Sequence, residues 1–177
     1  MLGSFSCCAL QAKTLDVHKA AKAVDVSSLK LMTTFAPERI NEFGVVSAEM
    51  RVYGAELCAL QYNPKDDRIH DSPLICLCRA GSEGLVKDYD PKYNALIDSI
   101  QLLIDAKADL NMPDGGGATP AWWAAHGSFN RGLKVLIEAK ADVNIPDCRG
   151  NTPLKNANTQ GTCAQSTAQI LIDAGAQ

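Results

Sequence analysis

The chain has 177 residues, of which 46% are apolar and 21% charged, and its formal net charge is −3. These are globular proportions, and a domain of this length buries a core that needs no disulfide or metal staple. The sequence has no cluster of five or more lysines and arginines, which argues against nucleic acid or an anionic membrane as the main partner. No apolar run approaches the roughly 18 residues that a membrane-spanning helix needs.

The seven cysteines are odd in number, irregular in spacing and without a CxxC pair. Free thiols in a reducing compartment fit this pattern better than a disulfide framework. Cys76 and Cys78 lie two residues apart on a predicted helix, so they point in different directions and form a poor chelating pair. We therefore expect a cytoplasmic protein with no metal site and no cofactor.

The segment Phe43–His70 contains an apolar periodicity. A helix is predicted there by the spacing of Val46, Met50, Tyr53, Leu57 and Leu60. A hairpin that turns at Gly54 is the alternative. The run Asn63–Asp67 then predicts an exposed turn. Further along, Ser82–Lys92 reads as a second insertion, made of charged and turn residues.

The second half of the chain repeats itself at an offset of 33 residues. The segment Asn111–Pro120 aligns without gaps with Asn144–Pro153, and the stretches before them match as well. A third copy of the pattern closes the chain as Leu171–Ala176. A period of this length is the signature of stacked repeats, each of which buries its apolar face only against a neighbour.

The residue types of the repeat predict a turn followed by two helices. In each copy Asp-x-x-Gly forms the turn, because aspartate bonds its own backbone and glycine tolerates positive φ. Threonine then caps a helix that opens with proline. Small residues such as Ala124 and Ala125 let a neighbouring helix approach closely. The second helix is predicted by the apolar spacing of Leu133, Leu136 and Ile137, which matches that of Ile100, Leu103 and Ile104.

Two motifs carry a family resemblance. Asp147-x-x-Gly150-x-Thr152-Pro153-Leu154 and Leu136-Ile-x-x-x-Ala141-Asp142-Val-Asn144 resemble the ankyrin repeat. The resemblance is strong over residues 111–177 and weaker upstream. It implies an all-α ankyrin-repeat solenoid of about four helix-turn-helix repeats, which form a single domain over residues 1–177.

The weaker resemblance places the upstream elements. Ser72-Pro73-Leu74 resembles the start of another first helix, with Tyr93–Asn111 as its second helix. Leu15–Ala21 and Val26–Met32 resemble an earlier helix pair. The expected repeats cover residues of about 14–42, 71–111, 112–144 and 145–177, with insertions at about 43–70 and 82–92.

Lys107 and Lys140 depart from the family pattern, because ankyrin repeats usually carry glycine at that place. A helix often ends there in a left-handed residue. Lysine is expected to cost about 1 kcal/mol at each position.

The adjacent Trp122 and Trp123 are the main candidate contact residues. The resemblance places Trp123 at the position that faces the concave groove, so we expect a partly exposed interface anchor. Its replacement by alanine would then weaken a complex by about 2 kcal/mol or more and leave the fold intact. The alternative is that Trp123 packs beneath the 43–70 insertion as part of the core. Trp122 replaces the family's usual histidine, and packing between repeats is its main expectation. The same groove column contains Lys19, Cys76 and Asn156.

The projecting loops supply the other candidates. Asp114 and Arg149 lie at the tips of the predicted turns, which line one edge of the binding surface in ankyrin-like folds. Tyr89 and Tyr93 belong to the second insertion, and loops on a rigid scaffold often carry function. For Asp114 and Arg149 the alternative is that they are solvated turn residues. For Tyr89 and Tyr93 the alternative is a solvated loop that one of the two tyrosines anchors.

The expected function is non-enzymatic binding of another protein by a chain that is monomeric when isolated. An adaptor or regulatory role fits, as does a bacterial effector that acts inside a host cell. The alternative is an enzyme or redox protein with a cysteine-based site in the irregular N-terminal half, since five of the seven cysteines precede residue 80. A structural subunit of a larger complex is a third alternative.

Overall fold

The computed structural model describes residues 26–35, 41, 44–45, 70–82, 91–157 and 164–177. Helices dominate these ranges, and they are accompanied by two very short strands. In chain order the elements are α3 (Val26–Phe35), β1 (Gly44–Val45), β2 (His70–Asp71), α4 (Pro73–Ser82), α5 (Pro91–Asp105), α6 (Pro120–His126), α7 (Asn130–Glu138), α8 (Pro153–Ala157) and α9 (Ala164–Asp173).

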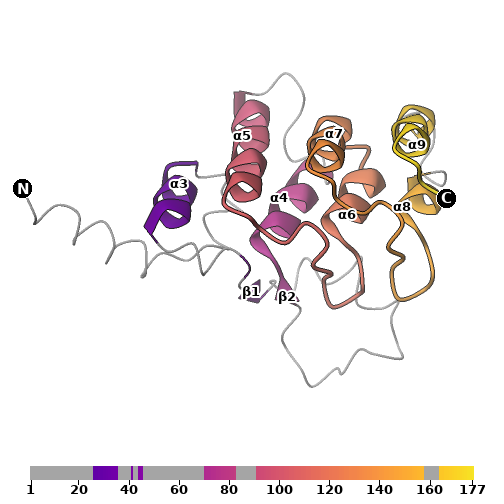
Figure 1. Cartoon of the computed structure of the whole chain (residues 1–177), viewed down its shortest axis with the longest axis horizontal. Coiled ribbons are helices and arrows are strands. Elements are labelled where there is room, and N and C mark those ends of the chain that lie inside the picture. The colour runs from indigo at the N-terminus through magenta and orange to yellow at the C-terminus, as the bar shows by residue number, and fades with distance from the viewer. Residues whose placement is uncertain (1–25, 36–40, 42–43, 46–69, 83–90, 158–163) are drawn as a thin grey trace, which may run out of the picture.

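The helices form two layers, as Figure 1 shows. We call α4, α6 and α8 the inner layer and α3, α5, α7 and α9 the outer layer. Each helix packs against its neighbours in the same layer, and each inner helix also packs against the outer helix that follows it in the chain. The buried leucines and alanines between the layers form one continuous core. The predicted stack of helix pairs is therefore confirmed.

Each inner helix begins with a hydroxyl cap followed by proline. Thr119 and Thr152 accept a hydrogen bond from the backbone N–H three residues ahead, at 3.2 and 3.3 Å. Ser72 does the same at the start of α4, at 3.3 Å. Proline follows each cap as the first helical residue, where its missing N–H costs nothing. The predicted helix starts are confirmed, including the one upstream of the strong repeats.

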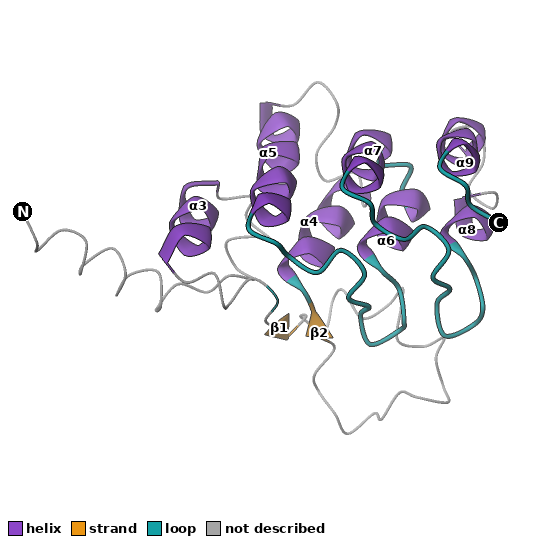
Figure 2. Cartoon of the chain, in the orientation of Figure 1, coloured by secondary structure: helices purple, strands orange, loops and turns teal. Residues whose placement is uncertain are grey.

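Two loops project beyond the helices, drawn in teal below them in Figure 2. We call residues 113–117 the central tip and residues 146–150 the C-terminal tip. Asp114 and Asp147 order them, because Oδ1 of each accepts the backbone N–H groups two and four residues ahead, at 2.8–3.0 Å. The glycines that close the turns, Gly117 and Gly150, have φ of 80° and 75°. The turn chemistry predicted from Asp-x-x-Gly is confirmed.

The two tips are also bonded to each other. The backbone N–H of Cys148 donates to the carbonyl oxygen of Gly116 at 3.0 Å. A Cβ on Gly117 would lie only 2.9 Å from the Cys148 nitrogen, in addition to the strain of its positive φ. The tips therefore touch through their backbones, and Gly117 is required there for space as well as for conformation.

The second helix of each strong repeat ends in a left-handed residue. Lys107 and Lys140 have φ of 67° and 72°, and Gly175 has 87° at the matching place of the last repeat. At all three positions the N–H of the left-handed residue donates to the carbonyl oxygen three residues before it. The N–H of the following residue donates to the carbonyl oxygen five residues before itself, and all of these bonds are 2.9 Å long. This is the Schellman arrangement. The left-handed backbone expected at the two lysines is confirmed.

Replacing Lys107 or Lys140 with glycine is expected to raise the free energy of unfolding by about 1 kcal/mol each, because the strain of a left-handed lysine is removed. Urea denaturation followed by circular dichroism measures the change. The matched control is Lys134→Gly, an exposed position inside α7, which should instead lose about 1 kcal/mol. A loss of stability in Lys140→Gly as large as in the control would contradict the expectation.

Three asparagines join successive repeats. Asn41, Asn111 and Asn144 each accept, through Oδ1, a backbone N–H from the turn after the next outer helix, at 2.8–2.9 Å. Asn41 follows α3 as Asn111 follows α5, so α3 takes the place of a second helix in an earlier repeat. On this ground we propose that the chain is a single domain of four repeats with the boundaries given above.

Three predicted boundaries differ from the structure. The helix predicted over Tyr93–Asn111 is α5, which ends at Asp105 because the chain turns left-handed at Lys107. α3 runs to Phe35, beyond the predicted Met32. α5 begins at Pro91, two residues before the predicted start at Tyr93, which leaves residues 83–90 for the second insertion. These residues and the helix predicted over Leu15–Ala21 lie outside the described residues.

The edges of the 43–70 insertion form an unpredicted antiparallel strand pair. Gly44 lies opposite Asp71, and Val45 lies opposite His70. The all-α expectation holds for the repeats and misses this small ladder. The helix predicted from Val46 onward, the alternative hairpin at Gly54 and the turn at 63–67 lie outside the described residues.

Candidate partner-binding surface

Trp123 is buried, with only 4% of its surface exposed. Its indole N–H donates to Asp114 Oδ2 at 2.9 Å. The Arg79 guanidinium lies over the ring, with Cζ 4.0 Å from the ring centroid. The expected partly exposed anchor is therefore wrong, because the ring is covered by the preceding repeat and its polar edge is satisfied inside the protein. The alternative is correct in that Trp123 belongs to the core, whereas most of the 43–70 insertion that it placed over the ring lies outside the described residues.

A buried charge cluster surrounds Trp123. The Arg79 guanidinium lies 2.9 Å from an Asp71 carboxylate oxygen and 3.6 Å from Asp114 Oδ2. The three side chains are 4%, 1% and 5% exposed. Sequence reasoning missed this cluster. The available signal was that Arg79 is the only charged residue of α4, an otherwise apolar helix.

Trp122 packs between two repeats, as expected. It is partly buried, and its indole N–H donates to the carbonyl oxygen of Asn151, at the base of the next inner helix, at 3.1 Å. Its ring stacks on His126 with centroids 5.3 Å apart and planes at 15°. Trp122 as a whole is intermediate between buried and exposed.

The other residues of the predicted groove column do not form an exposed line. Cys76 is buried in the core, and Asn156 is partly buried on α8. Lys19 lies outside the described residues. The column fails as a continuous surface because two of its members, Cys76 and Trp123, are covered by their neighbours.

Tyr93 is a core residue of α5 and not a loop contact. Its ring meets the edge of Phe129 at a centroid distance of 5.6 Å, and the Arg131 guanidinium covers it at 5.2 Å. In the alternative one of the tyrosines anchors the loop of the second insertion, and that loop lies at residues 83–90, outside the described residues. Tyr89 lies outside the described residues.

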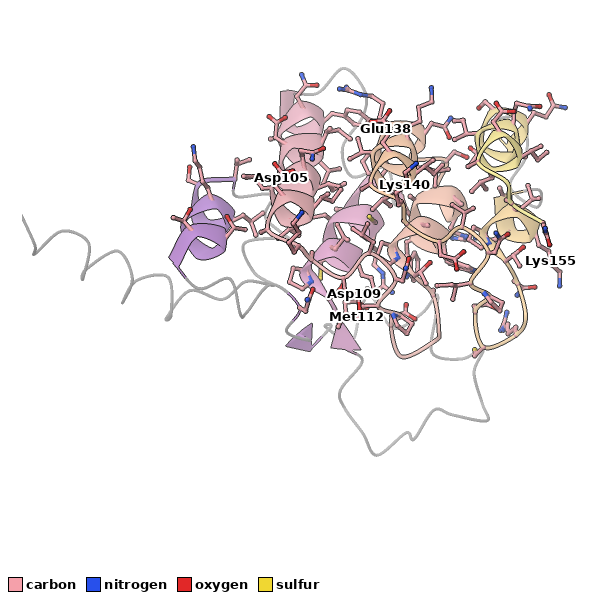
Figure 3. All side chains as sticks on the ribbon, viewed as in Figure 1. Asp105, Asp109, Met112, Glu138, Lys140 and Lys155 are labelled. Carbon is pink, nitrogen blue, oxygen red and sulfur yellow. The ribbon has the colours of Figure 1, made fainter. Side chains whose placement is uncertain are left out.

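Most of the exposed residues next to the inner layer that remain as candidates lie in the two tips. Arg149 is exposed, whereas Asp114 is partly buried and spends both carboxylate oxygens on internal bonds. Lys155 is exposed on α8, where Figure 3 labels it. We call tip surface the set of exposed tip residues together with two from the inner layer: Pro113, Gly115, Pro146, Cys148, Arg149, Gly150, Trp122 and Lys155.

The described cysteines do not all match the expected free thiols. Cys76 and Cys78 are free and buried. Cys148 is disulfide-bonded, so the expectation is wrong at that position. Burial, and then the neighbouring Cys76, raise the pKa of the Cys78 thiol far above its ordinary value. A nucleophilic cysteine needs the opposite, a lowered pKa and access to solvent. Neither Cys76 nor Cys78 therefore supports a cysteine-based enzyme.

No helix in the described ranges has both the length and the apolar character to cross a membrane. No curated protein matches the chain in sequence. A family model described as ankyrin repeats (3 copies) matches residues 92–177, which covers α5 to α9. Ankyrin repeats are in general protein–protein interaction modules and are typically not enzymes. The paired helices, the capped Thr-Pro starts and this match agree, and the chain from residue 92 to residue 177 therefore belongs to the ankyrin-repeat family.

Proposed function

We propose that this protein is a non-enzymatic interaction module that binds a partner protein through the tip surface. The observation that supports it is the order of the two tips. Asp114 and Asp147 hold the backbone of each tip through paired hydrogen bonds, and the tips are bonded to each other. The exposed tip residues therefore lie on an ordered backbone.

An ordered backbone favours binding because little conformational freedom is lost on association. The tip backbone is already ordered before a partner arrives, and the stacked helices behind it do not have to rearrange. Arg149 is an exposed planar charged residue, and Trp122 is a partly buried aromatic residue beside it in the tip surface. Both residue types are enriched among the side chains that dominate interface energies.

The proposal moves the contact from the groove column to the tips. Trp123, Cys76 and Tyr93 are buried, so a partner does not reach them without disrupting the core. Arg149 and Trp122 remain candidates, together with Asn156 at the edge of α8. Asp114 acts on the partner only by ordering the tip that carries Pro113 and Gly115.

A role as an adaptor, or as an effector inside a host cell, is the proposed biological setting. A binding module that acts alone as a monomer fits either role. The free thiols Cys76 and Cys78 fit the cytoplasm, whereas the disulfide at Cys148 fits an oxidising compartment. We propose the cytoplasm as the place where the chain folds, on the ground of the two buried free thiols.

Placing a photo-reactive benzoylphenylalanine at Arg149 is expected to cross-link a partner protein from the native extract. The matched control is the same residue at Lys134, which is exposed on α7 in the outer layer. We expect a discrete adduct from the tip position and none from the control. Arg149→Ala should then weaken binding of the adducted partner by about 1 kcal/mol or more. Equal adducts from both positions, or none from Arg149, would contradict the tip surface.

A further inference from the structure

The charge cluster around Trp123 joins three separate parts of the fold. Asp71 belongs to β2, Arg79 to α4, and Asp114 to the central tip. The same Asp114 that faces Arg79 through Oδ2 also bonds the tip backbone through Oδ1, at 2.8 and 2.9 Å. The Asp114 carboxylate therefore connects the ordered backbone of the central tip to the Arg79 guanidinium, which is also paired with Asp71 of β2.

The C-terminal tip lacks this connection. Asp147 bonds its own tip backbone in the same way, but its Oδ2 accepts a hydrogen bond from Asn151 Nδ2 at 3.2 Å. The second carboxylate oxygen of Asp147 is therefore bonded to a residue only four positions further along the chain. The two tips have the same construction, but the aspartate of the central tip is tied to a distant strand, whereas the aspartate of the C-terminal tip bonds a nearby side chain.

Burial makes the tie costly to break. Arg79 is 4% exposed, and in the described part of the chain its Nε has no hydrogen-bond partner. Its charge is therefore balanced chiefly by Asp71 and Asp114. Removing one partner of a buried ion pair leaves an uncompensated charge, which disturbs the groups that remain. A substitution at Asp71 should consequently alter the contacts of Asp114 through Arg79, although no described bond joins the two aspartates directly.

We propose that Asp71, Arg79, Asp114 and Trp123 form a latch that makes the order of the central tip depend on the β1–β2 ladder. The latch goes beyond the proposed function, because it concerns how the tip is set and not what it binds. The ladder sits at the two ends of the 43–70 insertion, and α4 follows it directly. The central tip is thereby sensitive to a part of the chain more than forty residues away, whereas Asp147 in the C-terminal tip has its second oxygen bonded to Asn151.

Backbone amide exchange of the full chain, followed by NMR, tests the latch. In Asp71→Asn the side-chain shape is kept and the charge is lost. The amides of Gly116 and Ala118, which bond Asp114, should then exchange about fivefold faster or more, a typical size for coupling between sites. The amides of Arg149 and Asn151, which bond Asp147, provide the internal control, and their rates should change much less, because the second oxygen of Asp147 is bonded to Asn151 and not to the charge cluster.

Arg79→Lys is the second variant, because it keeps the buried charge and is the safer choice for folding. The lysine ammonium does not stack on Trp123 as the planar guanidinium does, and it does not contact both carboxylates through separate donors in a fixed geometry. We expect the same one-sided acceleration at Gly116 and Ala118. Equal acceleration in both tips would show a general loss of stability, and unchanged rates at the central tip would show that it is ordered by Asp114 alone. Either result would overturn the latch.

Discussion

Replacing Trp123 with alanine is expected to lower the free energy of unfolding by about 3–5 kcal/mol, the range for a large buried aromatic residue. The ring is 4% exposed and sits beneath the Arg79 guanidinium. Its removal opens a cavity between α4 and α6 and leaves Asp114 without its indole donor. Urea denaturation followed by circular dichroism at the helix band measures the loss.

Two controls separate the packing of Trp123 from its hydrogen bond. Trp123→Phe keeps most of the ring and loses the N–H donor, so a smaller loss of about 1–2 kcal/mol is expected. Lys155→Ala, at an exposed position of α8, should change stability by no more than about 0.5 kcal/mol. If Trp123→Ala behaved like Lys155→Ala, the side chain would be a surface residue after all, and its role as an interface anchor would return.

Replacing Gly127 with alanine is expected to lower the free energy of unfolding by about 3 kcal/mol, the upper part of the range for overpacking. An added Cβ would lie 2.2 Å from both the Cα and the carbonyl oxygen of Ser82. These are backbone atoms, so no side chain can turn aside to make room. α4 and α6 would have to separate, and they share one of the main contacts of the inner layer.

Gly115→Ala is the matched control for this clash. Gly115 lies at the exposed central tip, and an added Cβ there meets nothing within 4 Å. Its stability should stay within about 0.5 kcal/mol of the parent chain. Thermal unfolding of the two variants gives the comparison. Similar melting temperatures for Gly127→Ala and Gly115→Ala would show that the helices separate at little cost, and the close approach of α4 and α6 would lose its importance.

The elements that the sequence predicts well are those whose cause lies within a few residues. A threonine cap before proline, an aspartate that bonds its own turn, and a lysine forced left-handed at a helix end depend on neighbours in the chain. The 33-residue period then shows that the pattern recurs. Periodicity and local chemistry together therefore predict the architecture of the repeats.

The candidate site was predicted less well because exposure depends on distant residues. Trp123 occupies a position that faces the groove in the family, yet Arg79 covers it from another repeat. No local pattern connects Arg79 with Asp71 and Asp114, since the three meet only after the layers have stacked. The role of Asn41 was missed for a similar reason, because its hydrogen bond reaches Asp109, 68 residues further along the chain.

The hydrogen bond from Cys148 to Gly116 makes the lengths of the two tips interdependent. Lengthening one loop by a single residue would offset its carbonyl from the amide it now meets in the other. New loop sequences grafted at either place would therefore have to be chosen as a matched pair. A library that varies the two loops separately would sample mostly combinations in which this contact is lost.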